Sequence, residues 1–427
     1  MSLLNKANII TTPTAYSVGK LHSVKPENEI YADFDFARNS SATRVGENGL
    51  IQSVAANLPR INYENGIGHL LLEPQRTNLI TYSEDFSGYG SSNAVITNNS
   101  ITSPDGTLSG TILADDNAGG TSAVQVYDNV TVDVSSDYTF SIFAKKKDLD
   151  FVALRLGSFT TPISDASFFN LNLGTVVSAG SGHVAEIENY GNGWYRCSVT
   201  FTTDAADTDG NLQIRMSENG TNTAVDLDNT SNIYIWGWQF EKGYLTSYIP
   251  TSGSATTRLA EVCNGSGNAS TFNDSEGVLM VQIGALTEIG TSESITVSSG
   301  SINNRILFRY NSTNQIRIIV ISAAIFSFDR TINISNITEY NKFAIKYKQN
   351  DFALWANGLE LETDTSGNTP IGLSELAFDD GSGSNDFYGK TKQLQYFPEA
   401  LTDSELECLT SWSSFNRMAI DLNYTIQ

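Results

Sequence analysis

The sequence predicts an all-β protein with two antiparallel β-sandwich (jelly-roll) domains behind an irregular N-terminal region. The 427 residues are too many for one ordinary core, so we expect two or three domains. The 34 glycines, with frequent Ser, Thr and Asn, provide turns between short strands, and long helical runs of Ala, Glu, Lys and Leu are missing. In many short segments the apolar residues fall at every second position, which is the period of a strand.

The first 80 residues have too few regularly spaced apolar positions to build a large core of their own. Residues 1–25 look like an extended arm, and residues 33–86 are short extended segments broken by turns. The turn signals are Asn48-Gly49 and Asn65-Gly66, because both central residues of such a hairpin turn need positive φ. We therefore expect residues 1–80 to form a separate N-terminal region.

We expect the first sandwich over residues 81–258. Tyr138–Ile142 and Trp194–Phe201 alternate apolar with polar residues, as half-buried strands do. Turn clusters such as Ser103–Gly106 and Asn189–Gly193 separate these strands. Several short alternating strands at regular spacing fit a jelly roll.

We expect the second sandwich over residues 262–427. Its strand-like segments are Asn304–Tyr310, Gln315–Ser322, Phe343–Lys348 and Phe352–Leu361, the last with a hairpin turn at Asn357-Gly358. Near the end, Thr402-Asp403-Ser404-Glu405 is a capping box, flanked by Leu401 and Leu406 at the spacing of a hydrophobic staple. A short helix should begin at Asp403 and pack Leu406 and Leu409 on the sandwich.

The composition excludes several classes of function. The chain has 25 Lys and Arg against 47 Asp and Glu, a net charge of −22, and its only cationic cluster is Lys145–Lys147, so no nucleic-acid partner is expected. The longest apolar run, Ile316–Phe326, contains Arg317 and predicts a strand without membrane insertion. No signal peptide is expected. Three widely spaced cysteines form no disulfide or metal framework, and Cys197 is expected to be a buried thiol.

We predict no catalytic residues. The three histidines have no metal-ligand spacing, and no Gly-x-Ser-x-Gly motif is present. Glu360, Glu362 and Asp364 alternate on one strand face, and a retaining glycosidase needs two carboxyl groups about 5 Å apart. These residues directly follow a hairpin turn and have no aromatic platform beside them, so a solvated edge is the favoured interpretation.

The strand Tyr234–Phe240 is the best binding candidate, because period two places its four large aromatic residues on one face. Such a row either stacks on sugars or fills a core. A core role is favoured for Trp236 and Phe240, whereas Trp238 lies beside polar neighbours near the strand end. Trp194 and Tyr195 point to opposite faces, so only one should be in the core. The ligand-binding candidates are Trp194, Trp238, Gln239, Glu241, Asp380 and Asn385.

Acidic loops provide candidate oxygen ligands for a structural calcium ion. Asp226 and Asp228, with Glu241 later, form one set, and Asp379 and Asp386, with Asp380 between them, form the other. No EF-hand spacing is present, so solvated loops are the alternative. Loops often carry binding residues, so the loop over residues 379–386 is also a ligand-binding candidate, although a mobile connection is the simpler interpretation.

Two N-terminal segments carry a resemblance to a known class. Residues 32–51 read ADFDFARNSSATRVGENGLI, and residues 70–86 read LLLEPQRTNLITYSEDF. Their order resembles the N-terminal cassette of bacteriophage virion proteins of the tail-fibre, spike or head-fibre kind. Farther along, YTFSIFAKK, NGWYRCSVTFT and IYIWGWQFEKG resemble a carbohydrate-binding-module-type jelly roll. NKFAIKYKQNDFALWANG and DFYGKTKQLQYFPEALTDSELECLTS resemble concanavalin A-like, laminin G-like sandwiches.

This resemblance implies a structural protein on the virion surface, made in the host bacterial cytoplasm. Its N-terminal region would attach to other virion proteins, and the chain would form a homo-oligomer, with a trimer favoured. The sandwiches would bind host-surface polysaccharide without catalysis, and modules of this kind often carry a structural calcium. The alternatives are a purely structural or decorating virion protein without a glycan ligand and, third, a polysaccharide depolymerase.

Overall fold

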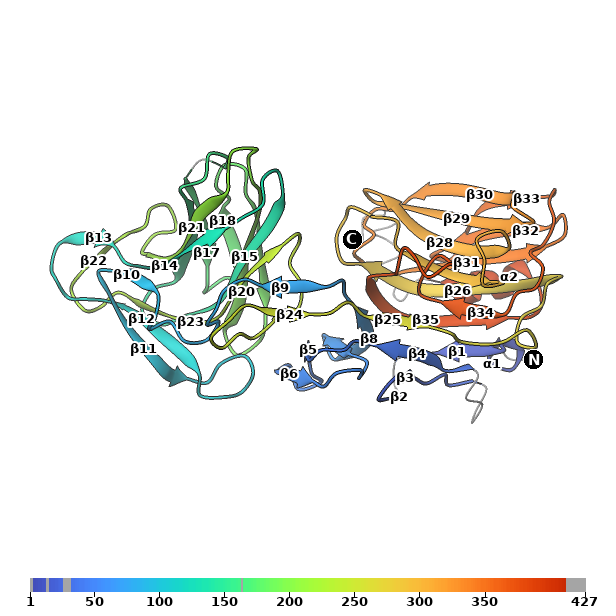
Figure 1. Ribbon diagram of the computed structural model, residues 1–427, viewed down its shortest axis with the longest axis horizontal. Coiled ribbons are helices and arrows are strands. Elements are labelled where there is room, and N and C mark those ends of the chain that lie inside the picture. The colour runs from blue at the N-terminus through green and yellow to red at the C-terminus, as the bar shows by residue number, and fades with distance from the viewer. Residues whose placement is uncertain (1–2, 13–14, 26–31, 163, 412–427) are drawn as a thin grey trace, which may run out of the picture. The chain divides into compact units, whose positions relative to one another are not determined.

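The computed structural model describes residues 3–12, 15–25, 32–162 and 164–411, and it confirms the all-β fold class (Figure 1). The chain divides into two compact units built from antiparallel sheets. The jelly-roll unit contains Ser41–Ser53 and Gln75–Leu259. The composite unit contains Met1–Ser40, Val54–Pro74 and Ala260–Gln427.

The jelly-roll unit has two six-stranded sheets. The first contains, in order, β10 (Gly90–Ser92), β14 (Gln125–Thr131), β21 (Asp209–Ser217), β16 (Phe151–Gly157), β17 (Asp165–Asn170) and β18 (Thr175–Ser178). The second contains β11 (Ala94–Ile101), β12 (Gly110–Asp115), β23 (Asn232–Lys242), β15 (Asp137–Lys146), β20 (Trp194–Thr202) and β19 (Val184–Asn189). Alternate residues of both sheets, such as Leu154, Leu212 and Ile142, form one buried core that includes the Cys197 thiol, as expected.

Short two-stranded sheets complete this unit. They pair β13 (Thr121–Ala123) with β22 (Ala224–Asp226), β9 (Arg76–Asn78) with β24 (Thr256–Arg258), and β5 (Ala42–Val45) with β6 (Ile51–Val54). The turn between β5 and β6 contains Asn48-Gly49, where only Gly49 has positive φ (75°). At Asn65-Gly66 and Asn357-Gly358 both residues have positive φ, as the hairpin signal predicts.

The composite unit has a larger and a smaller main sheet. The larger contains β33 (Leu359–Asp364), β32 (Phe352–Ala356), β31 (Asn341–Lys348), β26 (Glu276–Ala285), β35 (Gly389–Phe397), β8 (Ile67–Leu72) and β7 (Ile61–Glu64), with β1 (Ile9–Thr11) also pairing β35. The smaller contains β30 (Ile325–Asn333), β29 (Gln315–Ser322), β28 (Arg305–Ser312), β27 (Ser294–Ser298) and β34 (Glu375–Ala377). A further sheet joins β2 (Tyr16–Ser17), β3 (Lys20–Leu21), β4 (Phe34–Ala37) and β25 (Val262–Asn264).

The expectation of a separate N-terminal region over residues 1–80 is wrong. Ile9 of β1 pairs with Tyr396, and Leu70 of β8 pairs with Thr391, so both N-terminal strands extend the C-terminal sheet. The few apolar residues of this region suffice because the C-terminal strands provide the rest of the core. Residues 41–53 and 75–80 belong instead to the jelly-roll unit, whose long segment Gln75–Leu259 compares with the expected 81–258.

The described residues of the composite unit contain two short helices, α1 (Leu3–Lys6) and α2 (Asp403–Thr410). The second begins where the capping box predicts, and the Glu405 carboxylate accepts a hydrogen bond from the Thr402 N–H at 3.0 Å. Leu401, Leu406 and Leu409 are buried in one apolar cluster on the larger sheet, so the predicted packing of this helix is confirmed.

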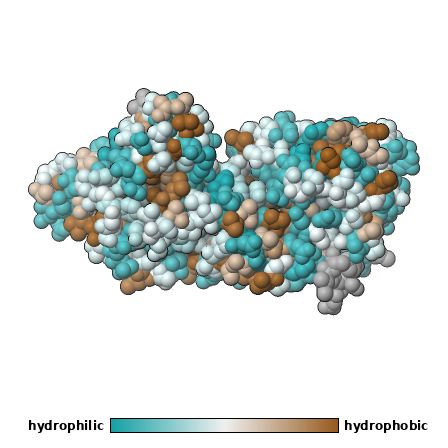
Figure 2. Space-filling view, in the orientation of Figure 1, coloured by the Kyte–Doolittle hydropathy of each residue, from teal (hydrophilic) through white to brown (hydrophobic). Residues whose placement is uncertain are grey.

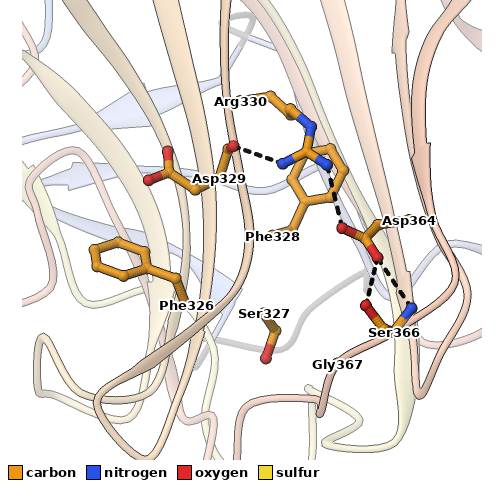
Figure 3. Close-up of a pocket in the computed structure, with 8 residues that line it drawn as sticks. All are labelled: Phe326, Ser327, Phe328, Asp329, Arg330, Asp364, Ser366 and Gly367. Carbon is orange, nitrogen blue, oxygen red and sulfur yellow. Dashed lines mark hydrogen bonds and ion pairs between the residues drawn. The ribbon is translucent and has the colours of Figure 1, made fainter.

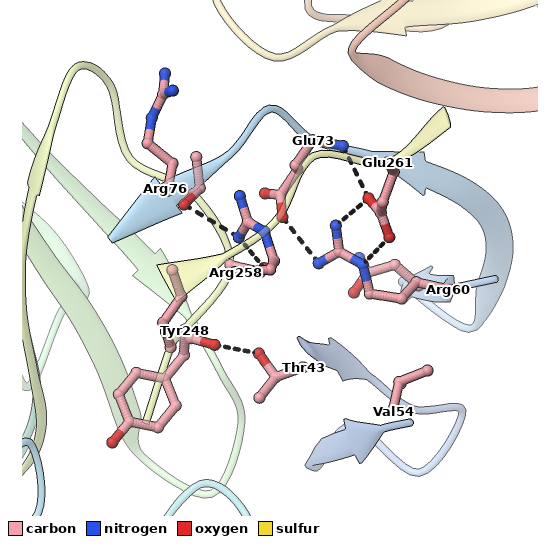
Figure 4. A network of polar contacts seen from close by, with 12 residues as sticks. Thr43, Val54, Arg60, Glu73, Arg76, Tyr248, Arg258 and Glu261 are labelled. Carbon is pink, nitrogen blue, oxygen red and sulfur yellow. Dashed lines mark hydrogen bonds and ion pairs between the residues drawn. The ribbon is translucent and has the colours of Figure 1, made fainter. Parts of the chain in front are cut away.

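The motif residues of the N-terminal cassette build buried polar networks (Figure 4). In the composite unit Glu261 pairs with both Arg38 (2.7 Å) and Arg60, and Glu73 pairs with Arg60 (2.8 Å). The side chains of both arginines and of Glu261 are 0% exposed. In the jelly-roll unit the Asn78 amide bonds four backbone groups. This distinctive stretch therefore has a structural role, because it satisfies buried polar groups.

The face in Figure 2 carries small, separate apolar patches among hydrophilic residues. Among the described residues, no helix is long and apolar enough to cross a membrane.

Candidate binding surface

The predicted single row of aromatic residues on β23 is wrong, because the strand contains a β-bulge. Ser141 pairs with Gln239 and Phe143 with Trp236, so Gly237 and Trp238 together lie opposite one residue of β15. Gly237 has a φ of 69°, which favours glycine at this position. The bulge turns Trp238 and Phe240 into the main core and leaves Trp236 on the other face of the sheet.

Trp238, Gln239 and Glu241 are all 0% exposed, so the expectation that they bind a ligand is wrong. The Trp238 ring stacks with that of Phe86, at a centroid distance of 6.1 Å. Glu241 accepts hydrogen bonds from the Thr246 hydroxyl and N–H and from the Gln239 amide, and burial raises its pKa. The Glu241 carboxylate thus holds the loop that follows β23 against the end of that strand.

Trp194 is 2% exposed, and the expectation that it binds a ligand is also wrong. Its indole N–H donates to the Thr102 carbonyl at 3.0 Å, and it lies in an aromatic cluster on the outer face of the second sheet. Ile51 of β6 packs on this cluster, so the cassette hairpin covers it. Tyr195 packs against the main core, so neighbouring residues are packed on both faces.

The loop over residues 379–386 lies on the outer face of the smaller composite sheet. Asp380 is 6% exposed, and its carboxylate accepts hydrogen bonds from Ser382 and from the Asn385 amide (2.8 Å). The backbone carbonyl of Asp379 accepts a hydrogen bond from the Thr296 hydroxyl. The structure therefore brings Asp380 and Asn385 together, with the Asp380 carboxylate already bonded within the loop.

The acidic residues that we considered for calcium do not fit such a site. Within the described ranges, no group of three or more Asp, Glu, His or Cys side chains is placed to hold a metal ion. Asp226 bonds the Thr121 hydroxyl, and Asp228 bonds Thr230. Asp379 bonds the Asn264 amide, and Asp386 lies 3.4 Å from the Tyr388 hydroxyl. Calcium takes six to eight oxygen ligands, which these separate groups do not provide.

A different surface, on the first sheet of the jelly-roll unit, gathers hydrogen-bonding side chains. Along β21 Leu212, Ile214 and Met216 enter the core, so the alternating polar residues lie on the outer face. The register places them beside polar residues of β14 and β16. The amide–arginine face consists of Gln125, Asn129, Arg155, Asn211, Gln213 and Arg215.

Three strands contribute to a hydrogen-bond relay across this face. Arg155 Nη1 donates to Gln213 Oε1 at 3.1 Å, and Gln213 Nε2 donates to Asn211 Oδ1 at 2.5 Å. Asn211 Nδ2 then donates to Asn129 Oδ1 at 2.9 Å; Asn129 is exposed, whereas Asn211 and Gln213 are 8% and 9% exposed. Each amide therefore has a fixed orientation, because every bond in the relay runs in the same direction.

Two buried polar atoms on the face lack a hydrogen-bond partner among the described residues. They are Gln125 Oε1 and Arg215 Nε, on side chains that the register places opposite one another. Buried polar atoms are usually bonded, directly or through water, and thirteen other buried side-chain atoms among the described residues share this state. Burial and, secondarily, the charge of Arg155 lower the pKa of Arg215 to about 10.

Aromatic and small residues frame the face. Tyr127 of β14 lies opposite Gln213, and its ring covers Gly90, where an added Cβ would be 2.4 Å from the ring. On the other side Phe168 packs with Ala153 and Ala166. The segment DGNLQIRMS held the sequence signal for this face, since its outward positions are Asn, Gln and Arg in alternation with core residues. Two amide residues, Gln239 and Asn385, are candidates from the sequence, but neither lies on this strand.

Two open grooves are weaker candidates, because their charged groups are already paired. In the composite unit a groove of about 360 Å³ runs beside Phe326, and Figure 3 shows Arg330 bonded to Asp364 there, at 3.2 Å. In the jelly-roll unit a groove of about 570 Å³ contains the ion pair of Asp133 and Lys242, at 2.9 Å.

Glu360 and Glu362 lie on β33, an edge strand that is exposed over Leu359–Thr363. Glu362 lies 3.6 Å from the Arg330 guanidinium, which gives it a structural partner. This placement agrees with the favoured solvated edge, whose charges also discourage pairing with another strand. The absence of catalysis stays a prediction.

No family model and no curated protein matches the chain. Among solved structures, it is similar to the CBM40 of a Ruminococcus gnavus IT-sialidase bound to α2,3-sialyllactose (15% identity, 35% of this chain covered, 94% of that one covered, TM-score 0.29). It is also similar to domain 4 of AbnA, an arabinanase from Geobacillus stearothermophilus, in complex with arabinotriose (13% identity, 40% of this chain covered, 82% of that one covered, TM-score 0.28). A third similarity is to a pentraxin from Limulus polyphemus (15% identity, 33% of this chain covered, 71% of that one covered, TM-score 0.26). TM-scores this low carry no argument about the ligand.

Proposed function

We propose that this protein binds a glycan without catalysis, through the amide–arginine face of its jelly-roll unit. The observation that carries the proposal is the oriented relay from Arg155 through Gln213 and Asn211 to Asn129, with unbonded polar atoms beside it. Neighbouring sugar hydroxyls both donate and accept hydrogen bonds, and an amide side chain does the same. The face thus matches the chemistry of a carbohydrate.

The face is also suited to binding because it is already ordered. Its side chains stand on β14, β16 and β21 of a six-stranded sheet, and their mutual hydrogen bonds hold them in place. Groups that are fixed before binding lose little conformational entropy when the ligand arrives. The half-buried ring of Tyr127 lies beside the polar row, where it would contact the C–H face of a sugar ring.

The resemblance of the N-terminal cassette supports a place for this chain on the surface of a bacteriophage particle. The ligand would then be a polysaccharide of the host surface, and a homo-oligomer, such as a trimer, would multiply weak contacts. Because β1, β7 and β8 are built into the composite unit, attachment to other virion proteins would use that unit.

The test is binding of the full chain to a glycan array of bacterial surface polysaccharides, followed by calorimetry with the best oligosaccharide. Gln213→Ala breaks the relay at its centre, and we expect it to weaken binding about tenfold, the effect of one or two lost hydrogen bonds. The matched control is Gln393→Ala, which removes a similar amide contact (to Gln282, 3.0 Å) in the composite unit. A chain that binds no glycan, or a Gln213→Ala variant that binds like the parent, contradicts the proposal.

A purely structural virion protein is the second candidate, since the cassette resemblance supports it equally. A reconstruction of the particle locates the chain, and normal adsorption of virions whose copies are blocked by antibody would favour this candidate. A depolymerase would instead release reducing ends from host polysaccharide and lose that activity on replacement of Glu360 or Glu362.

A further inference from the structure

The two arginines of the amide–arginine face differ from most other arginines of the chain. Arg317 forms a bidentate pair with Asp329, and Arg330 pairs with Asp364. No carboxylate among the described residues lies within ion-pairing distance of Arg155 or Arg215. This is unexpected in a chain with 47 acidic residues and 25 Lys and Arg.

Arg155 and Arg215 are diagonal neighbours on adjacent strands. Arg155 of β16 pairs with Gln213 of β21, and Arg215 stands two residues farther along β21, opposite Ala153. Like charges this close repel each other, which agrees with the direction of the Arg215 pKa shift. An isolated sheet gains nothing from this arrangement, whereas an anion between the two guanidinium groups would turn repulsion into attraction.

Most of the donors of these two side chains are available. Arg155 donates to Gln213, and Arg215 Nη1 donates to the Thr223 hydroxyl at 2.9 Å, each its one hydrogen bond among the described residues. A guanidinium has five N–H donors. The small neighbours Ala153 and Gly157 are both buried, and a Cβ at Gly157 would lie 3.2 Å from Arg155 Nη1.

We infer that the ligand of this face is an acidic glycan whose carboxylate or sulfate group lies between Arg155 and Arg215. The inference rests on the proposed function and names its ligand class. A guanidinium matches the two oxygens of such a group with two parallel N–H donors, a geometry that an ammonium does not offer. The amides from Gln213 to Asn129 then bond the neighbouring hydroxyls.

The net charge of −22 does not oppose this inference. At physiological ionic strength charges are screened over about 8 Å, so the groups nearest the anion decide its energy. Asp165 and Asp209, at the starts of β17 and β21, are not ion-paired with either arginine. Asp165 accepts hydrogen bonds from the N–H groups of Ala166 and Ser181, which lower its pKa, and the more distant charge of Arg155 lowers it further.

The test compares three forms of one oligosaccharide on the full chain: the uronic acid form, its carboxyl-reduced neutral form, and a sulfated neutral form. We expect one acidic form to bind about 10-fold or more tightly than the neutral form, the effect of a charge-assisted hydrogen bond. The two acidic arms identify which anion the site takes. Equal binding of all three forms overturns the inference but leaves glycan binding intact, whereas binding of none contradicts the proposed function itself.

Variants locate the anion. Arg215→Gln should reduce the preference for the acidic form, measured as the ratio of the acidic to the neutral affinity, to within a few-fold. Arg155→Lys keeps the positive charge but loses the two parallel N–H donors of the guanidinium, so it should retain only part of the preference for the acidic form. Arg330→Gln in the composite unit is the control and should change nothing. An unchanged preference in Arg215→Gln overturns the inference, and the comparison of oligosaccharide forms on the parent chain needs no variant to fold.

Discussion

Two pairs of arginines in this molecule lie in different surroundings: one pair is buried and ion-paired, and the other is half-buried without an ion pair among the described residues. Arg38 and Arg60 are fully buried, and each contacts the carboxylate of Glu261. Arg155 and Arg215 are half-buried on a sheet face without an acidic partner. Burial alone would lower the pKa of Arg60, but Glu261 and Glu73 outweigh it and raise that pKa, whereas burial and Arg155 lower that of Arg215. Pairing therefore separates arginines that build the fold from arginines left for a partner.

The largest effect should come from breaking the buried pairs. Glu261→Gln leaves Arg38 without its carboxylate in a dry interior, and we expect the composite unit to lose about 3–5 kcal/mol of unfolding free energy. Urea unfolding followed by circular dichroism measures it. Glu276→Gln, which removes a surface pair with Lys348 at 2.8 Å, is the control and should cost less than about 1 kcal/mol. Equal losses in both variants would remove the distinction between the two kinds of arginine.

His69 shows a third way to bury a basic group, which is to keep it neutral. It is 0% exposed in the composite unit, and burial lowers its pKa to about 4. The charge of Glu64 acts to raise this pKa, whereas the charges of Lys390 and Lys392 lower it further. Because the unfolded pKa is 6.5, the unfolded state binds the proton first. Stability should therefore be intact above pH 6.5 and fall by about 3 kcal/mol as the pH drops to about 4, at about 1.4 kcal/mol per pH unit.

His69→Gln tests this, since it keeps a polar partner for the Asn62 amide (3.5 Å) and cannot take up a proton. The difference in unfolding free energy between parent and variant should change with pH only between 6.5 and about 4. A constant difference across that range would mean that His69 does not titrate differently in the two states.

The smallest expected effect on stability belongs to Arg215. Arg215→Gln removes one of two like charges and no ion pair, so the unfolding free energy should change by less than about 0.5 kcal/mol or rise slightly. The melting temperature of the parent and variant checks this. A loss comparable to that of Glu261→Gln would make Arg215 a structural residue and would end the comparison on which the ligand proposal depends.

Much of the fold could be predicted because the signals are local. The turns at Asn65-Gly66 and Asn357-Gly358, the helix beginning at Asp403 and the period-two strands each depend on a few neighbouring residues. The candidate site could not be found in this way. One bulge at Gly237 places Trp238 on the opposite face from the one that a regular strand would give it. Trp194 is covered by Ile51 of the β5–β6 hairpin, a residue that lies 143 positions earlier in the sequence.

The sequence by itself determined that the chain forms strands, where many of them turn, and which side of each uninterrupted strand is apolar. Only the tertiary structure decided that β1, β7 and β8 complete a C-terminal sheet. It also decided that the β5–β6 hairpin covers the outer face of the second jelly-roll sheet and not the amide–arginine face of the first. The physical reason is that backbone conformation follows from adjacent residues. Burial and charge pairing depend instead on residues brought together from distant parts of the chain.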